Sequence, residues 1–357
     1  MSFVVNPYVE PNWDQDFLKN APNCSYEVCE QDGVAPNNYH ALSIYPEYFK
    51  IDGNWVLAVE SRMDTVPVIK SPTRVEIVEF RNLKKGDKVV VGRTEDASEG
   101  IYMYTGGFLA ETGEADTFAF RTGRSRETAF SKDYDELYEI MKFVKSNNDP
   151  ITWVVGPSLV YDDEARIAFC ELIKKGYVDA VLTGDNFAAI DIEKALHGGT
   201  LENLDSKRSA MLRTYDAIST IREAGSIKEA VEKGILKEGI MYNLIQEKKD
   251  YVLASSIRDP YTLPDTVNDV YEAQDKMRAH TRKTGMLICL STVLHTIASG
   301  NMTPSYNAFD GNIRPVYIYS IDFQEFSVNK LSDRGTLEVK TLVTNIHDFV
   351  SHINNNL

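Results

Sequence analysis

The sequence lacks the features that mark membrane-spanning, secreted and nucleic-acid-binding chains. Its 357 residues contain no apolar run of about 18 residues and no charged-then-apolar leader at Met1, so neither a membrane span nor a secretory signal is expected. Basic residues number 38 against 53 acidic ones, which gives a formal net charge of -15. Because nucleic acid and anionic membranes repel a net anion, we expect neither as a partner.

Cysteine is also scarce. The chain has four, at Cys24, Cys29, Cys170 and Cys289. They are too few and too scattered for a disulfide scaffold or a zinc knuckle. We therefore predict no metal site and a location in a reducing cytoplasm.

Two well-known phosphate-binding loops are missing as well. No G-x-G-x-x-G follows the first strand expected in the nucleotide-binding part, and no G-x-x-x-x-G-K-[ST] occurs anywhere. Any dinucleotide must therefore be held by other loops.

The length of the chain is most simply that of two domains, and its 43% of hydrophobic residues suffices for packed cores.

The most informative stretch that is present runs from 251 to 278. An apolar run, Tyr251 to Ser255, predicts a buried strand, and a polar loop and then a helix follow it. In an open α/β sheet, ligands bind beyond the carboxyl ends of the strands. The loop is therefore a candidate ligand site, and its polar side chains are those of Ser255, Ser256, Arg258, Asp259 and Asp265.

Two similar units lie upstream. Residues 151–155 predict a strand, Gly156-Pro157-Ser158 breaks it, and a helix is expected from about Asp162. Gly156 permits close backbone approach, and Ser158 with the following helix N-terminus could donate to a phosphate, although a simple turn remains equally open. A further strand at 178–182 runs into Gly184-Asp185-Asn186.

These alternating elements predict the architecture of the second part of the chain. The helix after Asn186 is expected to reach about Leu196, and further strands are expected at 286–290 and 316–321. Alternating strands and helices of this length imply an α/β fold: a Rossmann-like, doubly wound, mostly parallel sheet with helices on both faces.

The first part of the chain reads differently. Short β-rich runs at 55–60, 73–79 and 88–91 are separated by Pro, Gly and charged turns, which predicts a compact antiparallel sheet or a small barrel. A helix is expected at 134–144. The predicted division is a small β-rich domain at 1–105, a connector at 106–149 and a nucleotide-binding domain at 150–357.

Several single residues have both a structural and a functional interpretation. His295 has apolar neighbours at helical spacing and is either a core residue or a catalytic one. Asn301 follows Gly300, the expected end of that helix, and either caps it or reaches a ligand. Arg62 and Asp64 are either a surface ion pair or a clamp for a carboxylate and an ammonium group.

A family resemblance is carried by several motifs in one order. They include GPSLVYDDEARIAFCELIKKGYVDAVLTGDNFAAIDIE from Gly156, VLASSIRDPYTLPD from Val252 and LHTIASGNMTPS from Leu294, with Arg62-Met-Asp64 in the first part. The chain resembles the domain shared by the alternative-type ornithine cyclodeaminases of archaea and cyanobacteria and the lysine-oxoglutarate reductase/saccharopine dehydrogenase (LOR/SDH) family. The resemblance covers nearly the whole chain from about residue 30.

The resemblance implies an NAD-dependent enzyme that acts on a small amino acid by hydride transfer at the α-carbon and converts ornithine to proline and ammonia. It also implies a homo-oligomer, a dimer or a tetramer. The cofactor-binding residues would be Gly156, Pro157, Ser158, Gly184, Asp185, Asn186, Ser255, Ser256, Ile257 and Asp265. The substrate would be bound by Arg62, Arg258 and Asn301, and the candidate catalytic residues are Asp64, Asp259 and His295.

The chain departs from the family pattern at particular residues of the loops that are expected to form the site. Ile190 stands where a His is expected, the segments 199–203 and 206–211 contain no His, and Pro260-Tyr261-Thr262 replaces D-G-P. These losses leave two alternatives open: a cyclodeaminase homologue with a changed substrate, or a non-catalytic NAD-binding regulatory module.

Overall fold

The computed structural model describes residues 7–62, 64–108, 130–198, 207–256, 261–324 and 337–357. Contacts divide the chain into two compact units. We call them the N-terminal unit, made of Met1–Ala129, Asn301–Val316 and Gly335–Glu338, and the C-terminal unit, made of Phe130–Gly300, Tyr317–Arg334 and Val339–Leu357. Among the described residues, no helix is long and apolar enough to cross a membrane.

The N-terminal unit is built from antiparallel sheets. One sheet has the order β1-β6-β4-β5, a second has the order β3-β2-β7, and β13 and β14 form a separate hairpin. Its elements are α1 (Asp16–Lys19), β1 (Ser25–Val28), β2 (Glu47–Ile51), β3 (Asn54–Ala58), β4 (Thr65–Ser71), β5 (Arg74–Glu79), η1 (Phe80–Asn82), β6 (Lys88–Val91), β7 (Ile101–Met103), β13 (Tyr306–Phe309) and β14 (Asn312–Pro315).

Alternation of side chains explains how these strands build a core. In β5, the inward positions Val75, Ile77 and Glu79 are buried, and the residues between them are more exposed. Val75 and Ile77 pack with Phe49 of β2 and Ile101 of β7, so one apolar cluster joins the two sheets. The prediction of antiparallel strands in this part of the chain is confirmed.

The C-terminal unit contains a seven-stranded sheet with the order β11-β10-β9-β8-β12-β15-β16. The strand pairs from β11 to β15 are all parallel. Its strands are β8 (Ile151–Val155), β9 (Ala180–Gly184), β10 (Asp250–Ala254), β11 (Thr266–Val267), β12 (Met286–Leu290), β15 (Tyr317–Asp322) and β16 (Glu338–Val343). Apart from the short β11, this is the strand order of a Rossmann sheet, in which the order reverses between β8 and β12.

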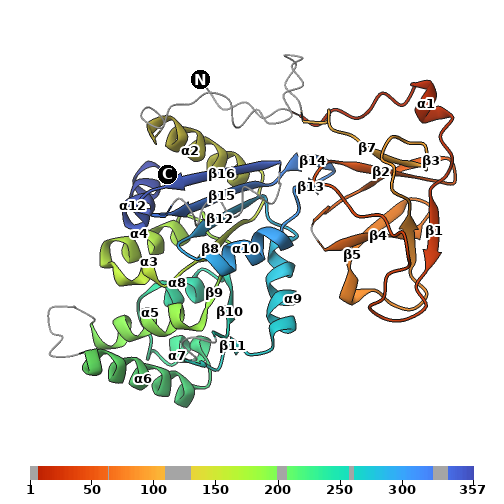
Figure 1. Ribbon diagram of the computed structural model, residues 1–357. Helices are drawn as coiled ribbons and strands as arrows, with labels where there is room; N and C mark the ends of the chain where they lie inside the picture. The colour runs from red at the N-terminus through yellow and green to blue at the C-terminus, as the bar shows by residue number, and fades with distance from the viewer. Residues whose placement is uncertain (1–6, 63, 109–129, 199–206, 257–260, 325–336) are drawn as a thin grey trace. The chain divides into compact units, whose positions relative to one another are not determined.

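Helices cover both faces of this sheet. Figure 1 shows α4 and α5 on one side of the strands and α9 and α10 on the other. The predicted α/β fold class is therefore confirmed. The helices are α2 (Phe130–Ser146), α3 (Ser158–Tyr161), α4 (Asp163–Lys174), α5 (Asp185–His197), α6 (Lys207–Ala224), α7 (Ile227–Glu232), α8 (Ile240–Gln246), α9 (Val270–Thr281), α10 (Val293–Met302) and α12 (Ile346–Asn356).

The structure tests the predicted start of one helix and the predicted end of another. Helix α4 begins where expected, because the Asp162 carboxylate accepts a hydrogen bond from the Ala165 N–H at 2.8 Å and caps the first turn. The expectation that α10 ends at Gly300 is wrong, since the helix continues to Met302. Asn301 therefore lies within the last turn of α10 and is not a residue beyond a glycine cap.

Candidate functional site

Three predicted cofactor loops follow neighbouring strands at one edge of the C-terminal sheet. Val155 of β8 is paired with Thr183 of β9, and Gly184 is paired with Ala254 of β10. The residues that come next, Gly156 after β8 and Ser255 after β10, therefore leave the sheet at the same edge. This is the carboxyl edge, where ligands bind in open α/β sheets.

Gly156 lies at the point where the strand order reverses. Its N–H donates to the Leu290 carbonyl at 2.8 Å, so β8 and β12 stay paired to their ends. A Cβ added at Gly156 would lie 2.0 Å from the Ser291 carbonyl oxygen, closer than any real contact. Ser291 itself has a left-handed φ of 49°. Only glycine allows this close approach of two backbones, which keeps the space beyond them free of a side chain.

Asp185 opens helix α5 directly after β9, and its side chain is fully buried. One carboxylate oxygen accepts a hydrogen bond from the Thr262 N–H at 3.2 Å. The other is buried and has no hydrogen-bond partner among the described residues. Burial raises the pKa of Asp185, and backbone N–H groups, first that of Thr262, oppose the rise. Asp185 thus retains a free acceptor at the carboxyl edge.

His295, in the first half of α10, lies close to the β9 loop. Its Cε1 atom would be 3.7 Å from a Cβ built on Gly184, and the Asn186 Oδ1 atom would be 3.3 Å from the same point. Burial lowers the pKa of His295, so the ring is neutral near pH 7. Within the described part of the chain, its ring nitrogens have no hydrogen-bond partner, which leaves them available to a ligand or a proton.

Ser158 and Asn301 each carry an oxygen that lacks a partner. The Ser158 Oγ and Asn301 Oδ1 atoms are buried, and neither has a hydrogen bond within the described residues. Ser158 begins α3, which is a single short turn, and the longer α4 starts only at Asp163. The hydroxyl of Ser158, rather than the N-terminus of a long helix, is therefore the donor that this loop offers.

Asp265 has internal hydrogen bonds instead. Its two oxygens accept from the Ile227 N–H at 2.9 Å and from the Tyr251 hydroxyl at 2.7 Å. It thereby fixes the start of α7 to β10. Within the described residues, its hydrogen bonds are with these elements and not with Gly156, Gly184 or His295.

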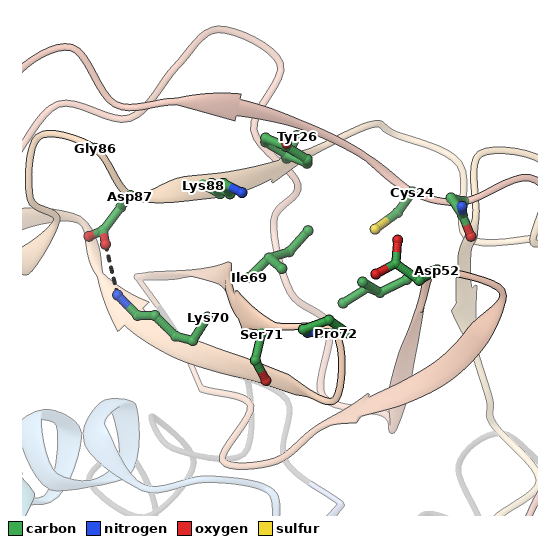
Figure 2. A pocket seen from close by; sticks show the side chains of 12 residues that line it. Cys24, Tyr26, Asp52, Ile69, Lys70, Ser71, Pro72, Gly86, Asp87 and Lys88 are labelled. Carbon is green, nitrogen blue, oxygen red and sulfur yellow. Dashed lines mark hydrogen bonds and ion pairs between the residues drawn. The ribbon is translucent and has the colours of Figure 1, made fainter.

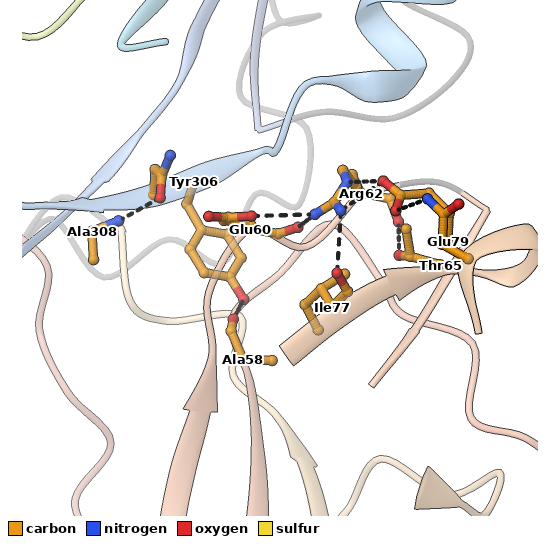
Figure 3. A network of polar contacts seen from close by, with 10 residues as sticks. Ala58, Glu60, Arg62, Thr65, Ile77, Glu79, Tyr306 and Ala308 are labelled. Atoms are coloured by element: carbon orange, nitrogen blue, oxygen red, sulfur yellow. Dashed lines mark hydrogen bonds and ion pairs between the residues drawn. The ribbon is translucent and has the colours of Figure 1, made fainter. Parts of the chain in front are cut away.

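Arg62 and Asp64 lie in the N-terminal unit. Arg62 is buried, and its guanidinium donates to the Glu79 carboxylate at 2.7 and 3.1 Å and to the carbonyl groups of Glu60 and Ile77 (Figure 3). Asp64 is exposed and has a left-handed φ of 57°. The structure therefore pairs Arg62 with Glu60 and Glu79 rather than with Asp64.

The remaining predicted site residues divide into two groups. Pro157 and Ser256 lie at the carboxyl edge and are partly buried. Ile257, Arg258 and Asp259 lie outside the described residues.

Two contributions to this edge were not predicted. Ser291 supplies the backbone that crosses Gly156, and Thr262 supplies the N–H that binds Asp185. A polar pair, Ser291-Thr292, directly after the predicted strand at 286–290 was the available signal for the first. The second depends on a loop conformation with a left-handed φ at Thr262, which has no sequence signal.

A separate cavity of about 500 Å³ lies in the N-terminal unit (Figure 2). Lys70 and Asp87 form a 2.7 Å ion pair on its wall, and Lys88 lies over the Tyr26 ring. Burial raises the pKa of the Cys24 thiol, which also lines it, to about 11. The thiol is therefore protonated and unreactive at neutral pH.

Comparison with known proteins gives consistent similarities. A family model described as arginine dihydrolase ArgZ-like, C-terminal, Rossmann fold matches residues 135–353. The chain is 36% identical to an ornithine cyclodeaminase of Methanocaldococcus jannaschii, over 91% of this chain and 75% of that protein. It is 31% identical to the bifunctional arginine dihydrolase/ornithine cyclodeaminase AgrE of Nostoc, over 94% of this chain and 47% of that protein.

Solved structures agree with this pattern. An LOR/SDH protein of Methanococcus maripaludis matches with a TM-score of 0.77 and 31% identity, over 95% of this chain and 97% of the other. AgrE in a ternary complex with ornithine and NAD+ matches with a TM-score of 0.58 and 27% identity, over 99% of this chain and 47% of the other.

Proposed function

Because the chain belongs to the ArgZ-like family that includes the archaeal ornithine cyclodeaminases, we propose that it is an NAD-dependent enzyme that converts ornithine to proline and ammonia. The observation that carries the proposal is the match to an archaeal ornithine cyclodeaminase over 91% of this chain and 75% of that enzyme. The ternary complex of AgrE with ornithine and NAD+ supports both the cofactor and the substrate.

The residues at the carboxyl edge of the C-terminal sheet fit a dinucleotide. A Cβ at Gly156 would collide with the Ser291 carbonyl oxygen, so glycine keeps this space open. Gly156 also lies where the strand order reverses, which is where dinucleotides bind in Rossmann sheets. The buried free oxygens of Ser158 and Asp185 match a phosphate and a ribose hydroxyl group, respectively. We assign the cofactor to these three residues together with Gly184, Asn186 and Ser255.

Asp185 also indicates which dinucleotide is bound. It follows β9, the second strand of this sheet along the chain. A carboxylate accepts hydrogen bonds from the ribose hydroxyl groups of NAD but repels the 2′-phosphate of NADP. NAD is therefore the better match.

We assign His295 the proton-transfer role. Its ring is neutral at pH 7 because burial lowers its pKa, so it accepts a proton from an amine of the substrate. NAD, when bound, supplies the reversible hydride acceptor for the α-carbon. Arg258 and Asp259 remain predicted as the partners of the α-carboxylate and the amines, because a guanidinium matches a carboxylate bidentately and a carboxylate binds an ammonium group.

The changed loops keep a second candidate open. Ile190 carries an apolar side chain where the family pattern has a histidine. That change favours either another amino acid as substrate or a regulatory module that binds NAD without turnover.

One experiment separates these functions. Purified protein is titrated with NADH by fluorescence and then assayed with ornithine and NAD+ for proline, ammonia and accumulated NADH. The proposal expects saturable NADH binding, and proline and ammonia in equal amounts without net NADH. Net NADH would indicate a simple dehydrogenase, and saturable binding with no turnover of any amino acid in a panel would favour the regulatory module. Folded protein that does not bind NADH would overturn the cofactor assignment.

A further inference from the structure

Three side chains of the N-terminal unit converge although their positions are distant in the sequence. His40 follows the bridge between Tyr39 and Val91, and Glu47 is the first residue of β2. Glu95 lies in the loop between β6 and β7, and its carbonyl accepts from the Met103 N–H at 3.0 Å. Met103 is in turn the strand partner of Glu47. One nitrogen or oxygen atom from each of His40, Glu47 and Glu95 lies within 4.8 Å of the other two.

The cluster is buried and has excess negative charge. His40 is 2% exposed and Glu47 is 0% exposed, and Glu95 is partly buried. The His40 Nε2 atom lies 2.7 Å from a Glu47 oxygen. In the described part of the chain, no Lys or Arg lies within ion-pair distance of either carboxylate. Even a protonated His40 would leave the three groups with a net charge of about -1, which is costly to bury without a cation.

The surrounding hydrogen bonds orient these groups as ligands. The His40 Nδ1 atom lies 3.4 Å from the Gly92 carbonyl oxygen, which can only accept, so Nδ1 carries a proton. Nε2 is then the ring atom that faces the carboxylates. The second oxygen of Glu47 accepts from the Ser43 N–H. A histidine that donates its other nitrogen to a carbonyl, and a carboxylate fixed by a backbone N–H, are the usual supports of a metal ligand set.

We propose that His40 Nε2, Glu47 and Glu95 bind a divalent transition-metal ion, with Zn²⁺ as the best match. One imidazole and two carboxylates suit Zn²⁺ and its neighbours, whereas Mg²⁺ and Ca²⁺ prefer oxygen ligands alone. Three protein ligands leave a fourth position for water. The ion balances the charge of the two carboxylates and cross-links three segments that are distant in the sequence.

The position of the cluster defines what the ion does. Glu47 belongs to the β3-β2-β7 sheet, while His40 is held to β6 of the other sheet by its N–H, which donates to the Val90 carbonyl at 2.9 Å. A bound ion therefore connects the two sheets of the N-terminal unit. Its effect is on the stability of this unit, and the proposal is independent of the ornithine reaction.

The test uses the full-length chain freed of metal by chelation. Co²⁺ is added as a spectroscopic probe, and Zn²⁺ is then added in competition. The proposal expects visible Co²⁺ absorption that saturates at one equivalent, loss of the signal with Zn²⁺, and a higher melting temperature in Zn²⁺ than in Mg²⁺ or Ca²⁺.

Glu95→Gln is the informative variant, because Glu95 is the least buried ligand and its loss removes one carboxylate with little change in shape. Loss of a supporting group alone weakens metal binding by about 10- to 100-fold, so loss of a ligand should weaken Zn²⁺ binding at least about tenfold. Glu27→Gln, which changes an exposed carboxylate on β1 of the same unit, should bind as the parent does. Circular dichroism checks that each variant is folded.

Two results would overturn the proposal. One is the absence of saturable Co²⁺ or Zn²⁺ binding by the folded parent chain. The other is equal binding by the parent and by Glu95→Gln, which would place the ion elsewhere. Either result would leave His40 and Glu47 as a buried hydrogen-bonded pair only.

Discussion

Helix α5 carries two fully buried aspartates with opposite surroundings. Asp191, in the middle of the helix, accepts from the Arg166 Nε at 2.6 Å and from the N–H groups of Ile240 and Met241 at 3.0 and 2.8 Å. Asp185, in the first turn, accepts from Thr262 through one oxygen and leaves the other without a partner in the described structure. The two regions share one helix and one residue type, so the difference lies in what surrounds each carboxylate.

The two carboxylates differ in how the cost of their burial is offset. The surroundings of Asp191 supply a cation and two backbone donors, which offset the cost of burying its charge. Those of Asp185 supply too few donors, and its pKa is raised by burial as a result. A buried carboxylate with spare acceptor capacity at a strand end is what a ligand with hydroxyl groups requires.

Replacing Asp191 should have the largest effect on stability. Asp191→Ala leaves the Arg166 guanidinium buried without its partner and removes the acceptor for the first N–H groups of α8. We expect a loss of about 3 to 5 kcal/mol in the free energy of unfolding, measured by urea denaturation.

The control for this prediction is the double variant Arg166→Met with Asp191→Leu. It removes both charges and should recover part of the lost stability, because no unpaired charge remains. A single Asp191→Ala variant as stable as the parent would show that the ion pair is not what holds α4, α5 and α8 together.

Gly156→Ala tests the other region, at the carboxyl edge. The added Cβ would approach the Ser291 carbonyl oxygen at 2.0 Å, so either β8 or β12 must shift. We expect a loss of about 1 to 3 kcal/mol of stability together with weaker NADH binding, measured by denaturation and fluorescence titration. Gly198→Ala is a control for glycine replacement itself, because Gly198 has a positive φ but no atom within 4 Å of the added Cβ. It should lose stability through backbone strain while NADH binding stays unchanged.

Asp185→Asn should change binding more than stability. Loss of a charged acceptor for the cofactor should weaken NADH binding by about tenfold, since hydrogen bonds to charged groups contribute about 1.5 kcal/mol or more. Because burial raises the pKa of Asp185 above its ordinary value of 3.8, the carboxylate costs stability as the pH rises above that value. The variant should therefore gain stability relative to the parent between pH 4 and neutrality. Thermal melts across this range measure the difference, and a gain on the acid side only would contradict the assignment.

His295→Gln should have the smallest effect on stability and a clear dependence on pH. The pKa of His295 is lowered from its ordinary value of 6.5, so the unfolded chain binds the proton more readily than the folded one. The stability of the parent should fall as the pH drops through 6.5, and the variant should lack this part of the fall. Activity should be lost at every pH. A variant that keeps full turnover would remove His295 from the proposed mechanism.

Parallel strands were the part of the fold that could be predicted best. The predicted limits of β8 and β12, at 151–155 and 286–290, match the structure, because strands buried on both faces read as continuous apolar runs. The strand β2 was not predicted, although all five of its residues are buried. It includes Glu47 and Lys50, and the Lys50 Nζ atom donates to the carbonyl groups of Leu18, Lys19 and Ala21. Such partners are distant in the sequence, so no local pattern indicates that a charged residue is buried.

The candidate site shows the same limit. Gly184 ends an apolar strand, and Gly156 and Ser255 each directly follow one. This local pattern was enough to place them at one sheet edge. The roles of Ser291 and Thr262 depend on which strands are neighbours and on the conformation of a loop. These are properties of the assembled sheet, and the sequence near either residue does not contain them.

The pairing of Val155 with Leu290 also has a consequence for how the protein is made. The two strands that flank the candidate cofactor site are separated by most of the C-terminal unit, so closing that long loop costs chain entropy before the contact gains any energy. On the ribosome, β8 emerges long before β12 and cannot form the site alone. We expect cofactor affinity to appear late in folding and in one step, when β12 docks. A nascent chain that stops before Met286 would then have no affinity for a dinucleotide.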